Sequence, residues 1–321
     1  MSKNTEAVAQ IKKIKEEIHN GIVGQESLVD GLILGLLADG HILIEGVPGL
    51  AKTRAVNLLA NICNVAFKRL QFTPDLLPAD IVGTRIYNQS KASFEVNKGP
   101  IFANFVLADE INRAPAKVQS ALLETMQEKQ VTIGDETFLV PKPFFVFATM
   151  NPVEQEGTYS LPEAQLDRFL MKLIVSYPTK KEEAEVVKMV IQETRLPEVQ
   201  KLMTAEDILN LQKIARGIFI EDKIISYITD IIQATRDPKA YGLNLENVIQ
   251  YGASPRASIA LALVGRARAL MFGRDSVLPE DIKAIAHNVL RHRIIPTYYA
   301  EAEGIKTEQI INEILSKVKV P

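Results

Sequence analysis

The sequence predicts an α/β domain with a parallel sheet at residues 1–178, followed by an all-helical domain at residues 179–321. Short apolar runs alternate with segments of helical periodicity in the first part, and one of these runs leads through a Gly/Pro-rich loop into a helix within residues 41–60. After Pro178 the periodicity is helical, with breaks at Pro and Gly. A chain of 321 residues is also long for a single core, so two domains are expected.

The composition is that of an ordinary globular protein. With 37 basic and 39 acidic residues, the net charge of -2 gives no global field that would draw the chain to nucleic acid or an acidic membrane. The single cysteine, Cys63, excludes an intrachain disulfide and is expected to be a small core residue. No window reaches the roughly 18 apolar residues of a membrane span, and the N-terminus lacks an apolar signal region. We therefore expect a cytoplasmic protein with no integral membrane segment.

The chain is predicted to begin with an amphipathic helix at residues 5–20, where apolar side chains recur at helical spacing among Lys and Glu. A Gly-x-x-Gly turn then leads into a second helix at residues 28–37. Because this turn precedes the first strand, Ile22, Val23 and Gly24 are candidates to line an adenine pocket. By themselves they are only a turn with two aliphatic residues.

Residues 41–60 have the pattern of a buried strand at 42–44, a tight loop and a helix that begins at Lys52. Such a loop presents backbone N–H groups and the positive end of a helix dipole to an anion. Lys52 would reach the outer phosphates, and the Thr53 hydroxyl would hold Mg²⁺. The segment therefore predicts a site for a phosphate chain, with a ligand-free strand-to-helix turn as the alternative.

Ala51 departs from the usual phosphate-loop pattern G-x-x-x-x-G-K-[ST], because it takes the place of the second Gly. Gly49 lies two residues earlier. A phosphate loop is expected to tolerate Ala at this position if its φ is negative. Other support for the site is therefore needed from the rest of the chain.

The region after the loop contains a second predicted strand at 65–72 and a short apolar helical turn at 76–77. A β-hairpin is predicted within 84–97, and an insertion of this length in a compact α/β unit is more often functional than decorative. After a helix at 116–130, a second hairpin is predicted at 131–140, with Gly and Asp at its turn.

Two further apolar runs end in polar residues. The run at 103–108 ends in Asp109 and Glu110, which is typical of a strand buried on both faces with acids at its C-terminal end. These acids would supply a Mg²⁺ ligand and a water-activating base; the alternative is a solvated turn or helix N-cap. The run at 144–148 leads to Asn151, which would position the attacking water or simply cap the next turn.

A short helix at 161–169 precedes the last predicted strand at 170–175 and carries Arg168, which is either a surface ion-pair residue or a cation offered to a neighbouring subunit. Helical periods then cover 180–195, 204–217, 221–236, 255–272, 279–291 and 306–318. Ser254 has the character of an N-cap, and Arg256 follows at the helix start. A basic residue there opposes the helix dipole, so Arg256 is expected to meet an anion such as a phosphate.

Taken in order, these motifs resemble an AAA+ ATPase. The chain resembles the MoxR family within that superfamily over nearly its whole length. The segments that carry this resemblance are GVPGLAKT, LADEINRAP, ATMNPVEQEGTYSLPEAQLDRF and GASPRAS. The family's loop typically reads G-x-P-G-x-A-K-T, which accounts for Ala51. The resemblance implies an αβα sandwich with a five-stranded parallel sheet, followed by an all-α lid domain.

The resemblance also implies roles for the nucleotide-site residues. Lys52 and Thr53 match the Walker A pair, whereas Asp109 and Glu110 match the Walker B pair, with Thr53 and Asp109 as metal ligands and Glu110 as the general base. The cofactors implied are ATP and Mg²⁺. The residues expected to bind the nucleotide are Val23, Gly24, Gly46, Val47, Pro48, Gly49, Leu50, Ala51, Lys52, Thr53, Arg54 and Arg256.

Three other polar residues match further parts of the family's machinery. Asn151 matches sensor 1, Arg168 the arginine finger supplied in trans, and Arg256 sensor 2 in the lid. A trans arginine makes hydrolysis conditional on assembly, so a homo-oligomeric ring, expected to be a hexamer, follows from the resemblance. Arg113 follows the acid pair closely and is either a second trans arginine or a structural pairing residue.

The function implied is that of a chaperone-like ATPase that remodels or assembles a client complex or helps a metalloenzyme mature. Its expected partner is a separate protein with a von Willebrand factor A-type domain. The hairpins at 84–97 and 131–140 match the helix-2 insert and the pre-sensor-1 hairpin, which face the ring pore in this clade. One alternative is a DNA-directed motor or chelatase-like subunit. The tip of the first hairpin, at 88–91, contains one cation, and the tip of the second, at 134–136, contains two acids, so these tips are poorly suited to contact phosphates. The other alternative is a low-turnover, nucleotide-dependent binding scaffold.

Overall fold

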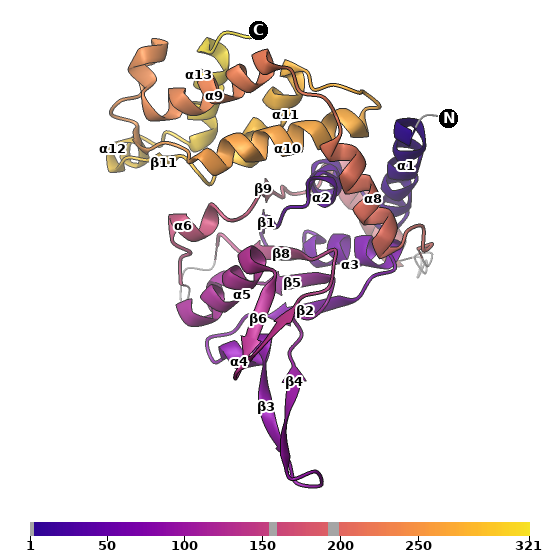
Figure 1. Ribbon diagram of the computed structural model, residues 1–321. Helices are drawn as coiled ribbons and strands as arrows, with labels where there is room; N and C mark the ends of the chain where they lie inside the picture. Colours follow the sequence, from indigo (N-terminus) through magenta and orange to yellow (C-terminus); the bar gives the residue numbers. More distant parts are fainter. Residues whose placement is uncertain (1–2, 154–158, 192–198) are drawn as a thin grey trace.

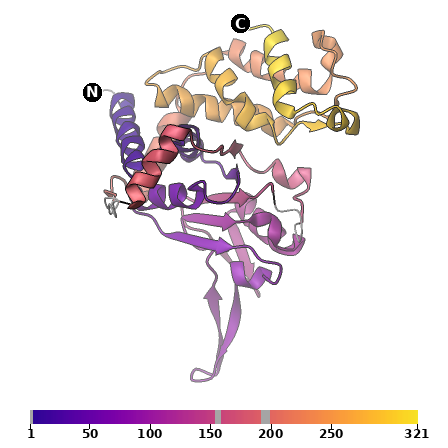
Figure 2. The same cartoon turned by 180° about the vertical axis from the view of Figure 1, so that it is seen from behind.

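The computed structural model describes residues 3–153, 159–191 and 199–321. It shows an α/β body with a helical lid at one end and a long hairpin at the other (Figures 1 and 2). The end of the helix predicted at 180–195 and the break at Pro197 lie outside the described residues.

The body is built on a five-stranded parallel sheet, as predicted. Its order is β2-β5-β8-β1-β9, and all the pairings are parallel. The strands are β1 (Ile42–Glu45), β2 (Phe67–Gln71), β5 (Phe105–Asp109), β8 (Phe145–Met150) and β9 (Met171–Ile174). Every residue of β5 is buried, which explains its continuous apolar sequence.

Helices cover both faces of the sheet, because successive strand residues point to opposite sides. Phe105 and Leu107 of β5 pack into one core, whereas Val106 and Ala108 pack into the other. The first core includes residues of α1 (Lys3–Gly21), α2 (Glu26–Ala38) and α3 (Lys52–Ile62). The second includes residues of α4 (Pro78–Val82) and α5 (Ala116–Glu128), with the short 3₁₀ helix η1 (Ile111–Arg113) between β5 and α5. The result is the expected αβα sandwich.

Two antiparallel hairpins lie outside this sheet. The first pairs β3 (Gly83–Asn88) with β4 (Ser93–Lys98), and it extends away from the body (Figure 1). The second pairs β6 (Gln130–Ile133) with β7 (Glu136–Leu139). Both agree with the sequence patterns, but the helical turn predicted at 76–77 lies two residues later, as α4.

The C-terminal part is mainly helical. It comprises α7 (Lys180–Ile191), α8 (Ala205–Arg216), α9 (Asp222–Arg236), η2 (Pro238–Tyr241), α10 (Pro255–Met271), α11 (Pro279–Leu290), α12 (Tyr298–Ala302) and α13 (Thr307–Lys317). It also contains an antiparallel pair that the sequence did not predict, β10 (Ile249–Tyr251) with β11 (Ile295–Pro296). Segments this short carry no readable alternation.

The lid packs directly on the body. Gln212 of α8 donates to the Leu36 carbonyl oxygen of α2 at 3.0 Å, and Arg216 pairs with Asp39 at 2.7 Å. Residues of α8, α9, α10 and α11 belong to the same buried core as α1 and α2. No helix in the described ranges has the length and apolar character needed to cross a membrane.

Candidate functional site

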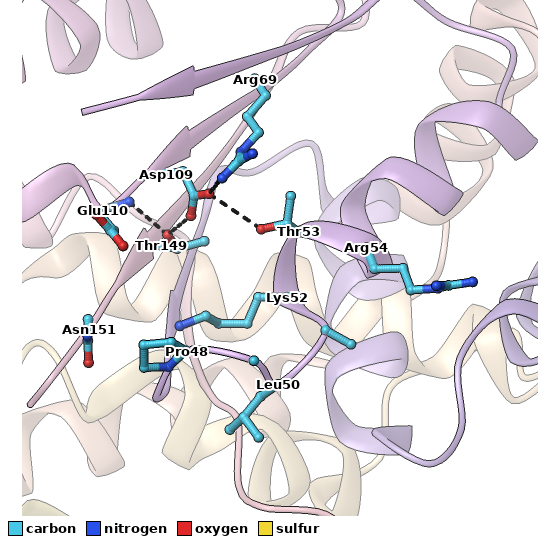
Figure 3. Close-up of a pocket in the computed structure, with 12 residues that line it drawn as sticks. Pro48, Leu50, Lys52, Thr53, Arg54, Arg69, Asp109, Glu110, Thr149 and Asn151 are labelled. Carbon is cyan, nitrogen blue, oxygen red and sulfur yellow. Dashed lines mark hydrogen bonds and ion pairs between the residues drawn. The ribbon is translucent and has the colours of Figure 1, made fainter. Parts of the chain in front are cut away.

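A cavity of about 400 Å³ opens at the carboxyl ends of β1, β5 and β8. In open α/β sheets this is the edge where ligands bind. It is lined by Pro48, Gly49, Leu50, Ala51, Lys52, Thr53, Arg54, Arg69, Asp109, Glu110, Thr149 and Asn151 (Figure 3). The structure therefore brings the predicted phosphate loop, acid pair and strand-tip Asn into one place.

The loop between β1 and α3 is held by its backbone. The Gly46 N–H donates to the Met150 carbonyl oxygen at 3.2 Å, which joins the loop to the end of β8, and Val47 packs against the core. Gly49 has φ 83°, and an added Cβ there would meet nothing within 4 Å. The open N-terminus of α3 faces the cavity, so its unpaired N–H groups are available to an anion.

Ala51 adopts a left-handed conformation, with φ 58° and ψ 16°. The expectation that Ala is tolerated through a negative φ is therefore wrong. Ala keeps the conformation that Gly would take, at a cost of about 1–2 kcal/mol for a residue with a Cβ. Strain of this kind is typical of functional turns whose surroundings fix the backbone.

Lys52 is the first residue of α3, and its ammonium donates to the Gly46 carbonyl oxygen within the loop. Burial lowers the pKa of this ammonium, while the carboxylates of Asp109, Glu110 and Glu45 act in the opposite direction. A bound phosphate would add further negative charge and favour the protonated form. Lys52 is thus placed to serve a phosphate at the loop.

Asp109 ends β5, and its carboxylate accepts hydrogen bonds from three side chains. Thr149 donates to Oδ1 at 2.5 Å, whereas Thr53 donates to Oδ2 at 3.4 Å. Arg69 of β2 donates to the same Oδ2 through Nη2 at 2.6 Å and through Nε at 3.0 Å. Hydroxyl and carboxylate oxygens are the donors that Mg²⁺ prefers, so Thr53 and Asp109 fit the predicted metal, with Arg69 as a competitor for the same oxygen.

Glu110 has φ 56° and ψ 51°, a left-handed conformation that is uncommon outside Gly and turns the chain at the end of β5. Its N–H donates to the Thr149 hydroxyl at 2.9 Å. Its Oε2 accepts from Gln71 at 2.9 Å and from Arg113 at 3.1 Å. Arg113 therefore pairs with the acid of its own chain, which favours the structural pairing interpretation of this residue.

Asn151 is 5% exposed and lies at the end of β8 on the rim of the same cavity. Its Oδ1 accepts from the Val153 N–H at 3.1 Å. Asn151 therefore caps the next turn and also lines the cavity, while its role in positioning water stays a prediction.

Sequence reasoning missed Arg69, Gln71 and Thr149 as site residues. Arg69 and Gln71 alternate on one face of β2, and Gln71 stands opposite Asp109 in the parallel register. The available signal was that polar residues stand near the carboxyl ends of predicted strands, the edge where ligands bind.

Gly46 and Val47 belong to the loop but are not among the residues that line the cavity, and four further predicted nucleotide-site residues lie outside the lining or face away from Asp109. Among the described residues, the cavity lining includes neither Val23 nor Gly24. A Cβ on Gly24 would lie 2.4 Å from Glu182, so the turn packs against the start of α7 instead. Arg54 lines the cavity, but its Nε donates to the Gly21 carbonyl oxygen at 2.8 Å, and its side chain points away from Asp109 (Figure 3). Arg256 does not reach the phosphate loop.

Arg256 instead shares a second cavity, of about 230 Å³, with Arg168. Arg256 lies 3.7 Å from Asp167 Oδ2, and Arg168 donates to the Leu123 carbonyl oxygen of α5 at 2.9 Å. In this structure Arg256 is therefore not among the residues that line the cavity of its own phosphate loop, and its contact with a nucleotide stays a prediction. The reason for its place is the position of the lid, which places the N-terminus of α10 beside Asp167 rather than over the loop.

Comparisons with known proteins agree with this architecture. The profile of the ATPase family associated with various cellular activities (AAA) matches residues 41–171, and that of the AAA lid domain matches residues 244–314. Chaperone MoxR1 of Mycobacterium tuberculosis is 48% identical over 98% of this chain and 81% of its own length. Protein MoxR of Methylorubrum extorquens is 28% identical over 95% of this chain and 92% of its own length. A crystal structure from Cytophaga hutchinsonii superposes with a TM-score of 0.93 at 52% identity, covering 99% of this chain and 97% of that one.

Proposed function

The chain belongs to the MoxR family of AAA+ ATPases, and from this premise we propose that it binds Mg-ATP, hydrolyses it and uses the energy to remodel or assemble a client protein complex. The observation that carries the proposal is the convergence of Lys52, Thr53, Asp109, Glu110 and Asn151 on one cavity at the N-terminus of α3. Each side chain has the chemistry that phosphoryl transfer to water requires.

The loop and Lys52 would hold the phosphates, because they offer N–H groups and a cation at a helix N-terminus. Thr53 and Asp109 would hold Mg²⁺, which neutralises phosphate charge when it is bound. Glu110 would take the proton of the attacking water, and Asn151 would orient that water. Gln71 and Arg113 restrain the Glu110 carboxylate, so it must turn from these partners to act.

Arg168 and Arg256 would act on the nucleotide of a neighbouring subunit. Both line a cavity distinct from that of their own phosphate loop. An arginine finger lowers the barrier by stabilising charge that develops in the transition state. Hydrolysis then depends on assembly, and we propose a homo-oligomeric ring, by family resemblance a hexamer.

The client and partner follow from the family. One relative carries the printed name chaperone, and we propose a chaperone-like role for this chain in assembling or metallating a client. The partner would be a separate protein with a von Willebrand factor A-type domain, working with this chain in the cytoplasm.

Steady-state hydrolysis and ATP binding by the wild type and Glu110→Gln test the proposal. The Gln side chain retains hydrogen-bonding capacity but cannot take a proton, so turnover should fall about 100-fold or more while ATP binding persists. Glu313→Gln, on the exposed face of α13, is the matched control and should retain full activity. Equal and negligible turnover in all three proteins would instead identify a binding scaffold.

The same variant tests for a client. Glu110→Gln loaded with ATP should capture a client protein in an affinity pull-down. Lys52→Ala, which lacks the phosphate-binding ammonium, should release it. Capture that is equal with both variants would show that the retained protein does not depend on nucleotide.

A further inference from the structure

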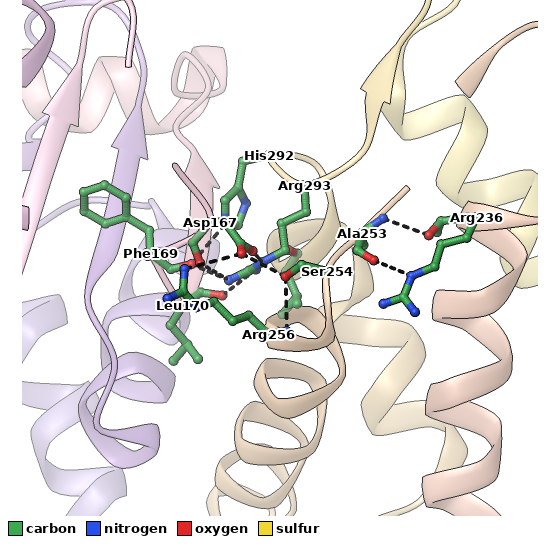
Figure 4. A network of polar contacts seen from close by, with 11 residues as sticks. Asp167, Phe169, Leu170, Arg236, Ala253, Ser254, Arg256, His292 and Arg293 are labelled. Carbon is green, nitrogen blue, oxygen red and sulfur yellow. Dashed lines mark hydrogen bonds and ion pairs between the residues drawn. The ribbon is translucent and has the colours of Figure 1, made fainter. Parts of the chain in front are cut away.

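A buried arginine of the lid, Arg293, forms several hydrogen bonds with the segment that contains Arg168. Arg293 follows α11, its side chain is 2% exposed, and its guanidinium points into residues 167–170 (Figure 4). Nε donates to Asp167 Oδ1 at 2.8 Å, and Nη1 donates to the Leu170 carbonyl oxygen at 3.1 Å. Nη2 donates to the carbonyl oxygens of Phe169 at 2.6 Å and Asp167 at 3.2 Å. These bonds enclose Arg168 on both sides along the chain.

A second lid contact holds the same segment. His292 Nε2 lies 3.1 Å from the Phe169 carbonyl oxygen. Asp167 also accepts from Ser254 Oγ at 2.8 Å, and Ser254 is the N-cap of α10, two residues before Arg256. The carboxylate of Asp167, the residue before Arg168, therefore contacts both the loop after α11 and the start of α10.

Such a network is specific to a planar guanidinium. Arg293 directs all three of its nitrogens to separate acceptors, including Val289 O at 2.5 Å. A lysine ammonium at this position could reach only part of this set, because its donors radiate from one atom. Arg293→Lys keeps the positive charge but loses the planar set of donors, so it isolates the contribution of the hydrogen-bond geometry.

We infer that Arg293 is a positioning residue for Arg168: it fixes the segment 167–170 to the lid, so that the lid sets how Arg168 is presented to the neighbouring subunit. This inference rests on the proposed trans role of Arg168. The Asp167 carboxylate contacts both Arg293, at 2.8 Å, and Arg256, at 3.7 Å. Lid and arginine finger then move as a unit.

The test is an assembly of two inactive subunits. An acceptor, Arg168→Ala, keeps its phosphate site but lacks the finger, and a donor, Lys52→Ala, keeps the finger but lacks a working site. Their mixture should recover ATPase activity. Arg293→Lys placed in the donor should lower the recovered kcat by about tenfold or more, with KM for ATP unchanged, because misplacement of a catalytic group costs rate rather than binding. Arg293→Lys placed in the acceptor should leave recovery within about twofold, since the acceptor's own phosphate site contains no contact to Arg293 among its described lining residues.

Arg274→Lys in the donor is the matched control. Arg274 also directs two nitrogens to one buried carboxylate, that of Asp281, but inside the lid and away from residues 167–170. Recovery with this variant should equal that of the parent mixture, with assembly of every mixture confirmed by size-exclusion chromatography.

Each outcome decides the inference. Equal recovery whichever subunit carries Arg293→Lys would overturn it and leave the trans role of Arg168 standing. A parent mixture that assembles without recovery would overturn both. If Arg293→Lys does not assemble, Asp167→Asn in the donor replaces it, because that change removes the charge that Arg293 Nε contacts. The same dependence on the donor subunit is expected, and its absence would overturn the inference.

Discussion

Arg69 Nη2 lies 2.6 Å from Asp109 Oδ2, the same carboxylate oxygen to which Thr53 donates. A guanidinium from β2 therefore occupies an oxygen of the carboxylate that the proposed function assigns to Mg²⁺. The Arg69 side chain is 52% exposed, whereas that of Asp109 is 11% exposed, so the ion pair is open to solvent and to exchange from the Arg69 side.

Replacing Arg69 should lower the Mg²⁺ concentration that ATP hydrolysis requires. A pair with one exposed partner is expected to contribute about 1 kcal/mol, the upper end of the range for exposed pairs, so Arg69→Gln should lower the Mg²⁺ concentration for half-maximal ATPase by about fivefold. A Mg²⁺ titration of ATPase rate at saturating ATP measures this. Arg216→Gln, which removes a similar ion pair with Asp39 at the lid interface, should not shift the midpoint. A higher Mg²⁺ requirement in Arg69→Gln would show that Arg69 assists the site rather than competing in it.

The site residues that could be predicted from the sequence are those that stand at or just after the carboxyl ends of the sheet strands. Lys52, Asp109 and Asn151 follow apolar runs, and parallel strands place their carboxyl ends at one edge, so their convergence could be expected. Arg69 escaped notice because the local pattern of β2 does not say that β5 is its neighbour. That adjacency is a long-range property of the strand order.

The position of Arg256 could not be predicted for a similar reason. Its local pattern indicated a helix start with an exposed cation, and α10 does begin at Pro255. Where that helix start points depends on how α10 packs on α2 and α8, which no local pattern encodes. The pair β10–β11 was missed because three- and two-residue strands show no periodicity.

Ala51→Gly should stabilise the protein. Ala51 holds φ at 58°, and relief of about 1–2 kcal/mol of strain outweighs the 0.4–1 kcal/mol that Gly gains in the unfolded chain, giving a net increase of about 0.5–1 kcal/mol in unfolding free energy. Urea unfolding measures it. Ala55→Gly, in the interior of α3, has no such strain to relieve and should lower stability by about 1 kcal/mol or more. A loss in Ala51→Gly equal to that control would refute the assignment of strain.

His41 should make the folded state sensitive to acid. Its Nδ1 accepts from the Val146 N–H at 3.0 Å and its Nε2 donates to the Met126 carbonyl oxygen at 3.1 Å, so the folded chain holds the neutral ring. Burial, with a smaller contribution from the charge of Lys129, lowers the pKa of His41 to about 3. The unfolded chain therefore binds a proton at a higher pH than the folded chain does, and stability falls as pH drops from about 6.5 toward 3.

The magnitude can be read from urea unfolding at about pH 7.5 and 5.5. His41 alone should cost about 1.4 kcal/mol over this interval, and His41→Gln should remove that part of the pH dependence whatever its effect on absolute stability. His287→Gln, on the partly exposed face of α11, should keep the wild-type slope. Identical slopes for the wild type and His41→Gln would contradict the neutral buried ring.

We expect that the two hairpins do not bind DNA. Arg85 of β3 pairs with Asp135 at 3.2 Å, which joins the two hairpins, and Lys91 pairs with Glu95 at 2.6 Å. The Lys98 ammonium lies 4.5 Å from the centre of the Phe138 ring. These cations already have partners, and phosphate binding would have to displace them.

Single-stranded DNA should therefore bind no more tightly than the non-specific range of about 1–100 µM at physiological salt. Fluorescence anisotropy with a labelled oligothymidine, measured with ATP-loaded Glu110→Gln at about 50 and 200 mM salt, tests this in the assembled state. The double variant Glu95→Lys with Asp135→Lys reverses the two acids and should gain steeply salt-dependent binding, which shows that the assay can detect it. Submicromolar, steeply salt-dependent binding without those two changes would favour the DNA-directed alternative, because a basic track would then exist despite the pairing of Arg85 and Lys91.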